Sequence, residues 1–515
     1  MAKVLFLQNV WVEYYGVMQI SALLKQHGHE VDITFEEDNL ILEYINQQCP
    51  DIIALSCMSV QWNWAKDLSL EIKKRGIETP IIIGGVHVSM YPEVTIEHPG
   101  IDILCLNEGE FPMLELCECI DKGKDYSDIN NLWIKKEGKI IKNRIRPKLN
   151  EDILSGLPYA DRYLYSKYEH FKNYPFVIIV GTRGCPFQCT FCEIPEINSR
   201  YGGGKAVYYR YPESLIDEIY ELKTKGLLEG KMIMFTDSTF NSRKKWFMEV
   251  MELYKERIGV SFSCNLRVDL VDEAQIKALK DAGCDNVRYG VESGDEDIRN
   301  KVLNKKLSDE KLFKCADLLK QYGIPQITFN LFGSPGETYE QAWKTIYMNQ
   351  RIQPSAVSSY IFLLFPGLRA TEEAIAQGRI NREDIALLDI PPYNFNLSLL
   401  ALHPNKNPEI TKICNLQKFS ILVVRYPFVE PFVRLICNLP PYNFFGLIYS
   451  LLQTLEWRNW STKATLRKLL FEAIINYNAL VATESNNNGL LAKLSNFFVK
   501  RERRGKEERV STKVS

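Results

Sequence analysis

The sequence predicts an α/β protein in three parts: an N-terminal doubly wound parallel sheet, a central partial barrel of six βα units, and a helical C-terminal region. Three observations support this prediction. At 515 residues the chain is longer than one hydrophobic core usually organises. Short apolar runs alternate with segments of helical periodicity through most of its length. From about Ile385 onward the strand-like runs stop and helical patterns dominate.

The first alternation predicts five strands with helices between them. The expected strands are residues 3–8, 30–34, 52–56, 81–83 and 103–105, and the expected helices are 18–26, 40–48, 64–74 and 111–121. Strands that alternate with helices favour a parallel sheet with helices on both faces. Such sheets bind ligands at the carboxyl ends of their strands.

Five residues at these strand ends are candidate ligand contacts. They are Ser56 after the third strand, Gly84 and Gly85 after the fourth, and Glu108 and Gly109 after the fifth. Glycine lets a backbone approach a bulky ligand closely, and a small hydroxyl leaves room while offering a hydrogen bond. The alternative for each residue is ordinary turn chemistry or helix capping.

A hairpin is expected next, at residues 132–135 and 139–142 around Gly138, followed by a segment that suits a domain boundary. We therefore expect a first domain over residues 1–146, a linker over 147–175, and a barrel over 176–384. A helical domain is expected over 385–485. The charged tail, 486–515, is expected to be disordered because its charges are mixed in sign.

The most informative stretch is a set of three cysteines that follows the strand expected at 176–180. Cys185, Cys189 and Cys192 have the spacing C-x3-C-x2-C. A four-iron cluster held by protein alone takes four cysteines, so three leave one iron with an open coordination position. The alternatives are a zinc site, which would need a fourth ligand brought in by folding, and a chance cluster of buried thiols.

Further strands are expected at 231–236, 260–265, 286–290, 326–332 and 356–364, with helices that begin near residues 212, 242, 272, 309 and 338. With 176–180 they make six βα units, fewer than the eight of a complete barrel. Loops at the carboxyl ends of barrel strands carry the chemistry of such folds. The polar residues there are Asp237, Ser238, Arg267, Glu292 and Ser293, with Arg299 about a turn beyond. Helix caps and surface ion pairs are the alternatives.

The cysteine motif resembles that of the radical S-adenosylmethionine (SAM) superfamily. The first quarter, with Leu55-Ser56-Cys57, Ile83-Gly84-Gly85 and Gly109-Glu110, resembles the cobalamin-binding domain that precedes many of these enzymes, a Rossmann-like fold. The central region then resembles the TIM-like radical SAM barrel. One departure is that the motif Asp-x-His-x-x-Gly is absent, so histidine is not expected to hold cobalt from below.

This resemblance implies three cofactors: a [4Fe-4S] cluster on Cys185, Cys189 and Cys192, SAM at its open iron, and cobalamin. It also implies an electron donor such as flavodoxin or ferredoxin. Reductive cleavage of SAM gives a 5′-deoxyadenosyl radical, which removes hydrogen from a substrate carbon. By the same resemblance, Asp237 and Ser238 lie where the SAM amino group is held, although the usual Gly-Gly-Glu is missing. Arg267 would hold the SAM carboxylate, and Glu292, Ser293 and Arg299 would lie near the ribose.

The leading function is methylation of an unactivated carbon in a small or lipid-like substrate. The runner-up is radical oxidative cyclisation or rearrangement, as in the anaerobic porphyrin cyclases that this architecture also resembles. A non-catalytic cobalamin or SAM sensor is the hypothesis from another class, but a sensor needs no open iron. A methylthiolating tRNA enzyme is disfavoured, because the N-terminal cysteine set for a second cluster and an obvious basic RNA-binding tail domain are lacking.

Composition limits the partners and the compartment. The formal net charge of -1 shows no global bias toward nucleic acid, and no nucleic-acid partner is expected. The N-terminus has no secretory pattern, and 13 cysteines, an odd number, suit reduced thiols, so a cytoplasmic location is expected. The apolar stretch 419–452 is interrupted by charges and prolines, which argues against a membrane span. A buried cap is expected there, and a surface for a lipid or a peripheral membrane contact is the sharper hypothesis.

Overall fold

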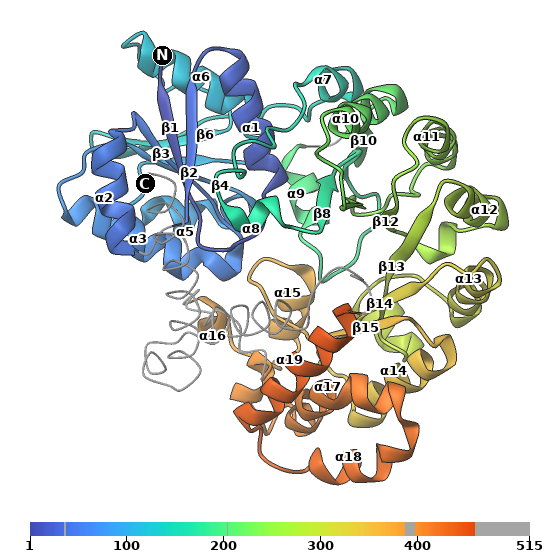
Figure 1. Cartoon of the computed structure of the whole chain (residues 1–515). Coiled ribbons are helices and arrows are strands. Elements are labelled where there is room, and N and C mark those ends of the chain that lie inside the picture. The colour runs from blue at the N-terminus through green and yellow to red at the C-terminus, as the bar shows by residue number, and fades with distance from the viewer. Residues whose placement is uncertain (36–37, 203, 387–396, 459–515) are drawn as a thin grey trace, which may run out of the picture. The chain divides into compact units, whose positions relative to one another are not determined.

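The computed structural model describes residues 1–35, 38–202, 204–386 and 397–458 (Figure 1). Its contacts divide the chain into two compact units. Unit 1 holds residues 1–289, 303–325 and 365–373, and unit 2 holds 290–302, 326–364 and 374 onward. The expected tail, 486–515, and much of the expected helical domain lie outside the described residues. The domain boundaries expected at 146, 175 and 384 stay predictions.

The five strands expected at the N-terminus are confirmed and form one parallel sheet in unit 1. They are β1 (Lys3–Leu7), β2 (Glu30–Thr34), β3 (Ile52–Ser56), β4 (Ile81–Gly84) and β5 (Ile103–Cys105). The expected hairpin, β6 (Leu132–Lys136) and β7 (Lys139–Lys142), extends this sheet antiparallel from β5. The strand order is β2-β1-β3-β4-β5-β6-β7. The order reverses between β1 and β3, and doubly wound sheets bind ligands at such a switch point.

Helices cover both faces of this sheet. On one face α1 (Tyr15–Gln26) packs against α6 (Glu110–Asp121) (Figure 1). The other helices of this region are α2 (Asp38–Gln48), η1 (Ser59–Gln61), α3 (Trp62–Lys74), α4 (Val86–Met90) and α5 (Pro92–Glu97). In α3 the buried residues Trp62, Ala65, Leu68 and Ile72 recur at helical spacing, which explains why this segment packs as a helix.

The segment expected to be a linker packs closely on the first sheet. It contains α7 (Glu151–Gly156), whose N-terminus is capped by the Asn150 side chain, and α8 (Glu169–Lys172). Leu154, Tyr165 and Phe171 from this segment belong to the same buried core as the strands β1 to β5. The segment therefore extends the first core rather than crossing solvent.

All six barrel strands are confirmed, four of them beginning in unit 1. There β8 (Phe176–Ile179), β11 (Met232–Phe235), β12 (Phe262–Asn265) and β13 (Cys284–Glu292) pair in parallel in that order. The helices between and after them are α9 (Ile194–Arg200), α10 (Pro212–Thr224), α11 (Lys244–Arg257), η2 (Val268–Leu270), α12 (Glu273–Asp281) and α13 (Asp309–Gln321).

A small hairpin that the sequence pattern did not predict precedes the cysteines. β9 (Thr182–Gly184) pairs antiparallel with β10 (Val207–Tyr209). Gly184 has φ +97°, and a Cβ atom there would lie 2.1 Å from the carbonyl oxygen of Ala206. Only glycine fits this position, so Gly184 fixes the start of the cysteine loop.

Unit 2 carries the last two barrel strands and the C-terminal helices. β14 (Gln326–Phe332) and β15 (Ala356–Ile361) pair in parallel. The remaining elements are η3 (Ile298–Val302), α14 (Tyr339–Ile352), α15 (Arg369–Ala376), α16 (Arg382–Ala386), η4 (Leu399–Leu402), α17 (Ile410–Arg425), η5 (Pro427–Val429), α18 (Glu430–Ile436) and α19 (Asn443–Arg458). Trp343, Leu416 and Val433 share one core of this unit. Among the described residues, no helix is both long and apolar enough to cross a membrane.

Candidate functional site

A cavity of about 370 Å³ lies at the carboxyl ends of the first sheet's strands, within unit 1. All five candidate contacts from that sheet line it: Ser56, Gly84, Gly85, Glu108 and Gly109. Val180 and Arg183, which directly precede the cysteine loop, line the same cavity. The structure therefore brings the predicted strand-end residues together beside the first barrel strand.

The cavity is shaped by missing side chains. A Cβ atom on Gly85, whose φ is +99°, would lie 2.7 Å from the carbonyl oxygen of Cys57. A Cβ atom on Gly109 would lie 3.0 Å from the side chain of Ile20. The Asn107 amide, at the end of β5, is buried with neither its oxygen nor its nitrogen hydrogen-bonded within the described residues. Backbone without side chains leaves room for a large ligand, and an amide without a partner can bind a polar group at the ligand's edge. Cobalamin is a large ligand with such polar groups.

Arg183, which precedes the cysteine loop, binds two carboxylates at the end of the first sheet. This contact was not predicted from the sequence. Its guanidinium forms ion pairs with Glu108, at 3.2 Å, and with Glu110. Burial raises the pKa of Glu108, although Arg183 opposes that rise. One oxygen of Glu110, Oε2, has no partner within the described residues. The signal available in the sequence was the arginine two residues before the first cysteine.

Arg183→Gln is expected to lower the free energy of unfolding by about 2 kcal/mol, because it leaves the buried Glu110 and the half-buried Glu108 without their cation. Urea unfolding of the anaerobically purified protein measures this. The matched control is Arg146→Gln, which removes a more exposed ion pair with Glu115 and should cost less than about 1 kcal/mol. Equal losses in both variants would contradict the role given to Arg183.

The three cysteines follow β9 in a partly exposed loop, and none is in a disulfide. The Thr239 hydroxyl lies 3.5 Å from Cys185 Sγ. No three or more His, Cys, Asp or Glu side chains of the described residues are arranged to hold a single metal ion. Three free thiols on one loop fit a cluster that is larger than one ion.

Arg267 lies next to this loop. Its Nη1 donates to Cys189 Sγ at 3.9 Å, and its guanidinium carbon is 3.8 Å from the centre of the Phe187 ring. Asp269 accepts from Nε at 2.7 Å, and the backbone oxygen of Lys305 accepts from Nη2. The structure thus places this cation at the cysteines, while its contact with a SAM carboxylate stays a prediction.

Asp237 and Ser238 follow β11 and differ in exposure. Asp237 is buried, and its Oδ1 accepts from the Gly181 amide at 3.0 Å and from Thr182 Oγ1 at 2.6 Å. The carboxylate therefore fixes the turn between β8 and β9. Ser238 is exposed. Their roles at the SAM amino group stay predictions.

Burial raises the pKa of Asp237 to about 6, against hydrogen bonds from Thr182 and Gly181 that lower it. The native chain then holds the Asp237 proton more tightly than the unfolded chain, in which the pKa of this carboxyl is near 3.8. Stability from this proton is present below about pH 4 and is lost as the pH rises through 6. We expect the free energy of unfolding to fall by up to about 3 kcal/mol across this window. Asp237→Asn should flatten the fall in urea titrations, whereas Asp281→Asn, at an exposed site, should not.

The other predicted residues lie in unit 2. Glu292 ends β13 with φ +63°, and Ser293 is fully buried. Arg299, also fully buried, donates from Nη1 to the backbone oxygen of Ser293 at 2.8 Å. Arg299 therefore supports the Glu292–Ser293 turn, and contact of these residues with a ribose stays a prediction.

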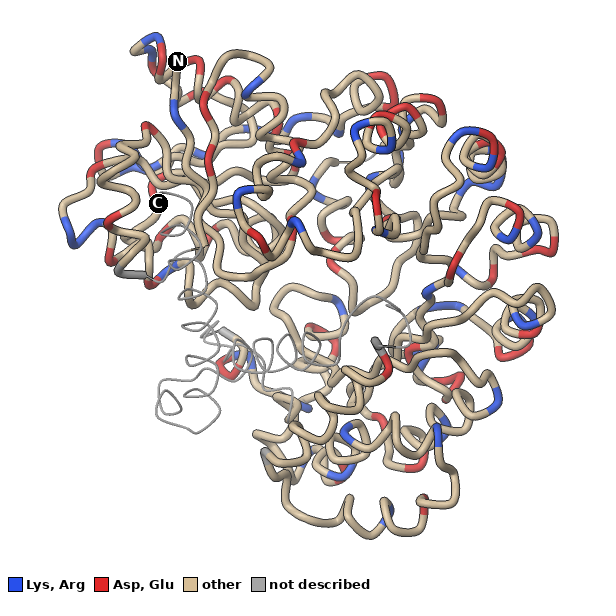
Figure 2. The backbone as a smooth tube through the Cα atoms, in the orientation of Figure 1, with Lys and Arg blue, Asp and Glu red and all other residues tan. Residues whose placement is uncertain are grey.

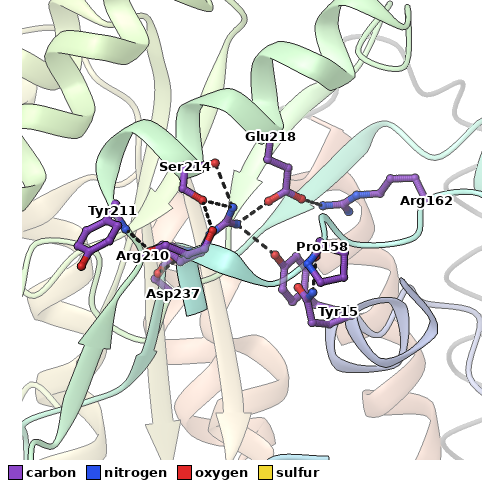
Figure 3. A network of polar contacts seen from close by, with 11 residues as sticks. Tyr15, Pro158, Arg162, Arg210, Tyr211, Ser214, Glu218 and Asp237 are labelled. Atoms are coloured by element: carbon purple, nitrogen blue, oxygen red, sulfur yellow. Dashed lines mark hydrogen bonds and ion pairs between the residues drawn. The ribbon is translucent and has the colours of Figure 1, made fainter. Parts of the chain in front are cut away.

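A buried charge network behind the cavity was also missed (Figure 3). Glu218 on α10 pairs with Arg162, at 3.1 Å, and with Arg210. Arg210 Nη1 also donates to the hydroxyl of Tyr15, at 3.4 Å, and Tyr15 lines the cavity. Burial and the Glu218 charge raise the pKa of Tyr15 to about 12, so its hydroxyl is neutral. The network joins the start of α1, the segment after α7 and the first long barrel helix.

Comparison with protein families matches both regions. The model of the B12 binding domain matches residues 12–116, and that of the radical SAM superfamily matches residues 179–347. The chain is a B12-binding radical SAM protein. Its cofactors are a [4Fe-4S] cluster, SAM and cobalamin, and it is an enzyme. The sensor hypothesis is thereby set aside.

Curated relatives of this B12-binding radical SAM protein cover most of its length. An uncharacterised methyltransferase of Pyrococcus horikoshii is 28% identical over 353 residues, 68% of this chain and 74% of the relative. An anaerobic magnesium-protoporphyrin IX monomethyl ester cyclase of Rubrivivax gelatinosus is 25% identical over 439 residues, 82% of this chain and 75% of the relative. A bacteriochlorophyllide d C-8(2)-methyltransferase of Chlorobaculum tepidum is 25% identical, over 72% and 78% of the two chains.

Solved structures share the fold. The radical SAM methyltransferase TsrM of Kitasatospora setae, with cobalamin and a [4Fe-4S] cluster bound, matches with a TM-score of 0.61 at 20% identity, over 73% of this chain and 78% of that one. The cobalamin-dependent SAM radical enzyme OxsB, with aqua-cobalamin and SAM, matches with a TM-score of 0.62 at 16% identity, over 98% and 75%. These likenesses confirm the predicted fold class of a cobalamin-binding domain joined to a radical SAM barrel.

Proposed function

We propose that this enzyme methylates an unactivated carbon of a small or lipid-like molecule. The observation that carries the proposal is the shared cavity of unit 1. Val180 and Arg183, just before the cluster cysteines, line it together with the strand-end residues of the B12-binding domain. A methyl donor held there is next to the loop that starts the radical reaction, as methyl transfer to a carbon radical requires.

When bound, the cluster and SAM supply a 5′-deoxyadenosyl radical, and cobalamin supplies the methyl group. The chain's residues bind and orient these groups. Cys185, Cys189 and Cys192 would hold three irons and leave the fourth for SAM. Arg267, fixed by Asp269, keeps a positive charge beside Cys189 and would favour the anionic thiolate form of that ligand. Asn107 offers an amide donor and acceptor to the polar edge of cobalamin.

One face of the strands in unit 2 supports the proposal that the substrate is apolar. Phe329 and Leu331 of β14 and Tyr360 of β15 lie on this face, because alternate strand residues point the same way. All three are partly or clearly exposed, and the rings of Phe329 and Tyr360 lie 6.5 Å apart. Their partners on the other face, such as Phe332, are buried against α17. Exposed aromatic side chains of this kind suit a hydrophobic ligand.

The second candidate is oxidative cyclisation, favoured by the similarity to the Rubrivivax cyclase over 82% of this chain. The two reactions differ in what happens to SAM. Methylation consumes a methyl group and leaves S-adenosylhomocysteine, whereas cyclisation leaves only the products of reductive cleavage.

The experiment is an anaerobic assay of the cobalamin-loaded enzyme with methyl-deuterated SAM, a bacterial lipid extract and reduced flavodoxin as the proposed electron donor. Substrate-dependent S-adenosylhomocysteine, together with a deuterated methyl group in one extracted molecule, is expected. Formation of 5′-deoxyadenosine and a dehydrogenated product without S-adenosylhomocysteine would replace methylation by cyclisation. The control is the same extract with the Cys189→Ala variant.

A further inference from the structure

A stripe of exposed apolar side chains runs along η5, α18 and the turn after it in unit 2. Phe428, Phe432, Leu435 and Leu439 are 81%, 62%, 69% and 45% exposed. Their spacing of four, three and four residues places them on one face of a helical segment. We name these four residues the α18 stripe.

A neighbouring face of this segment is also apolar and is already used. Val433 and Cys437 are fully buried in the core of unit 2, and Val429 and Ile436 pack against that core. The segment therefore cannot rotate to bury the α18 stripe without exposing these residues. Its apolar character on both faces calls for a second apolar partner.

The sequence that follows α18 lacks charge. No Asp, Glu, Lys or Arg occurs between Arg434 and Glu456, and Figure 2 shows this stretch in tan. Within α18, Arg434 pairs with Glu430 and also with Glu340 of α14, at 2.8 Å each. Tyr426, Tyr442 and Phe444 are exposed beside the stripe. Aromatic side chains of this mixed type are favoured at the interface between headgroups and acyl chains.

The shape of the segment fits a surface contact rather than a span. Pro427, Pro431, Pro440 and Pro441 interrupt it, and α18 has only seven residues. An interfacial contact needs a buried apolar face together with a second signal, such as basic residues that attract anionic lipid. Residues 459–515, which follow α19, contain eleven Lys or Arg and five Asp or Glu, in a chain whose net charge is -1.

We propose that the α18 stripe inserts into the surface of an anionic lipid bilayer, with the basic residues after α19 as the electrostatic second signal. The enzyme would then work at the membrane surface as a peripheral protein. This inference does not depend on the methylation reaction, since vesicle binding is measured without substrate or SAM.

The test is sedimentation of the full-length cofactor-loaded protein with vesicles. One set contains equal parts of phosphatidylcholine and phosphatidylglycerol, and the other contains phosphatidylcholine alone. We expect binding to the anionic vesicles that weakens with added salt. The double variant Phe428→Ser/Phe432→Ser should lower the partition coefficient at least about tenfold, since each phenylalanine buries a large apolar area. Leu435→Ser alone should give a smaller loss.

The matched control is Val94→Ser/Tyr163→Ser, which removes two exposed apolar side chains of unit 1 and should leave binding unchanged. Replacing Lys500, Arg501, Arg503 and Arg504 by Gln should weaken binding to anionic vesicles only. Iron content and circular dichroism check that each variant is folded. No binding by the unchanged chain overturns the proposal, whether a protein or another part of the chain covers the stripe. Binding that survives the Phe428→Ser/Phe432→Ser change also overturns it, because charge alone would then explain it.

Discussion

Cys189→Ala is expected to abolish formation of 5′-deoxyadenosine from SAM while leaving cobalamin bound. The reason is that a three-cysteine cluster has no spare ligand, so loss of one thiolate releases the cluster or blocks its open iron. The cavity residues around Gly85 and Glu108 do not include this cysteine. The measurements are chromatography of the reaction products, iron analysis, and the visible absorbance of cobalamin on one anaerobic preparation.

Cys119→Ala is the matched control, because Cys119 is a partly exposed free thiol on α6 far along the chain from the cluster loop. It should keep full iron content and activity. SAM cleavage by the Cys189→Ala enzyme would contradict the assignment of the cluster ligands. Loss of cobalamin in that variant would mean that the loop also holds the B12-binding domain in shape.

Gly85→Ala is the second change with a large expected effect, namely loss of cobalamin binding. The added methyl group meets the Cys57 carbonyl oxygen at 2.7 Å, and the φ of +99° is strained for alanine. Strain and overpacking together should lower the free energy of unfolding by about 3 kcal/mol. Urea unfolding measures the stability, and cobalamin absorbance measures the bound cofactor per chain.

Gly123→Ala separates the two causes. Gly123 also has a positive φ, +61°, but a Cβ atom there meets nothing within 4 Å. Its alanine variant should therefore show the strain alone, about 1 kcal/mol, and keep its cobalamin. If both variants lost the same stability and both kept cobalamin, the close approach at Gly85 would have no part in the site.

The regular strands were predictable because a strand that is buried on both faces needs a continuous run of apolar residues in the sequence, as at Ile81 to Ile83. The β9–β10 hairpin was not, since Thr182–Gly184 is short and polar and its pairing depends on Val207–Tyr209, more than twenty residues away. For the same reason the ion pairs of Arg183 escaped detection. Their partners, Glu108 and Glu110, are brought close only by folding.

The candidate site shows the same division. The cysteine spacing is local, so the cluster ligands were named from the sequence alone. Glycines such as Gly85 were also named, because bare backbone after a strand is visible in the sequence. The position of Asn107 after the fifth strand was also visible in the sequence, but the burial of its amide without a partner was not, because that depends on how α4 and β5 pack around it.

The buried network of Glu218 with Arg162, Arg210 and Tyr15 has a consequence for how unit 1 comes apart. Opening the segment that carries Arg162, or the helix that carries Glu218, would leave a charge unpaired in an apolar interior, at a cost of several kcal/mol. Partial unfolding that separates the first sheet and its Arg162 segment from α10 is therefore disfavoured. Heating should melt that region and the start of the barrel in one cooperative calorimetric transition, and their slowest amide protons should exchange with similar free energies.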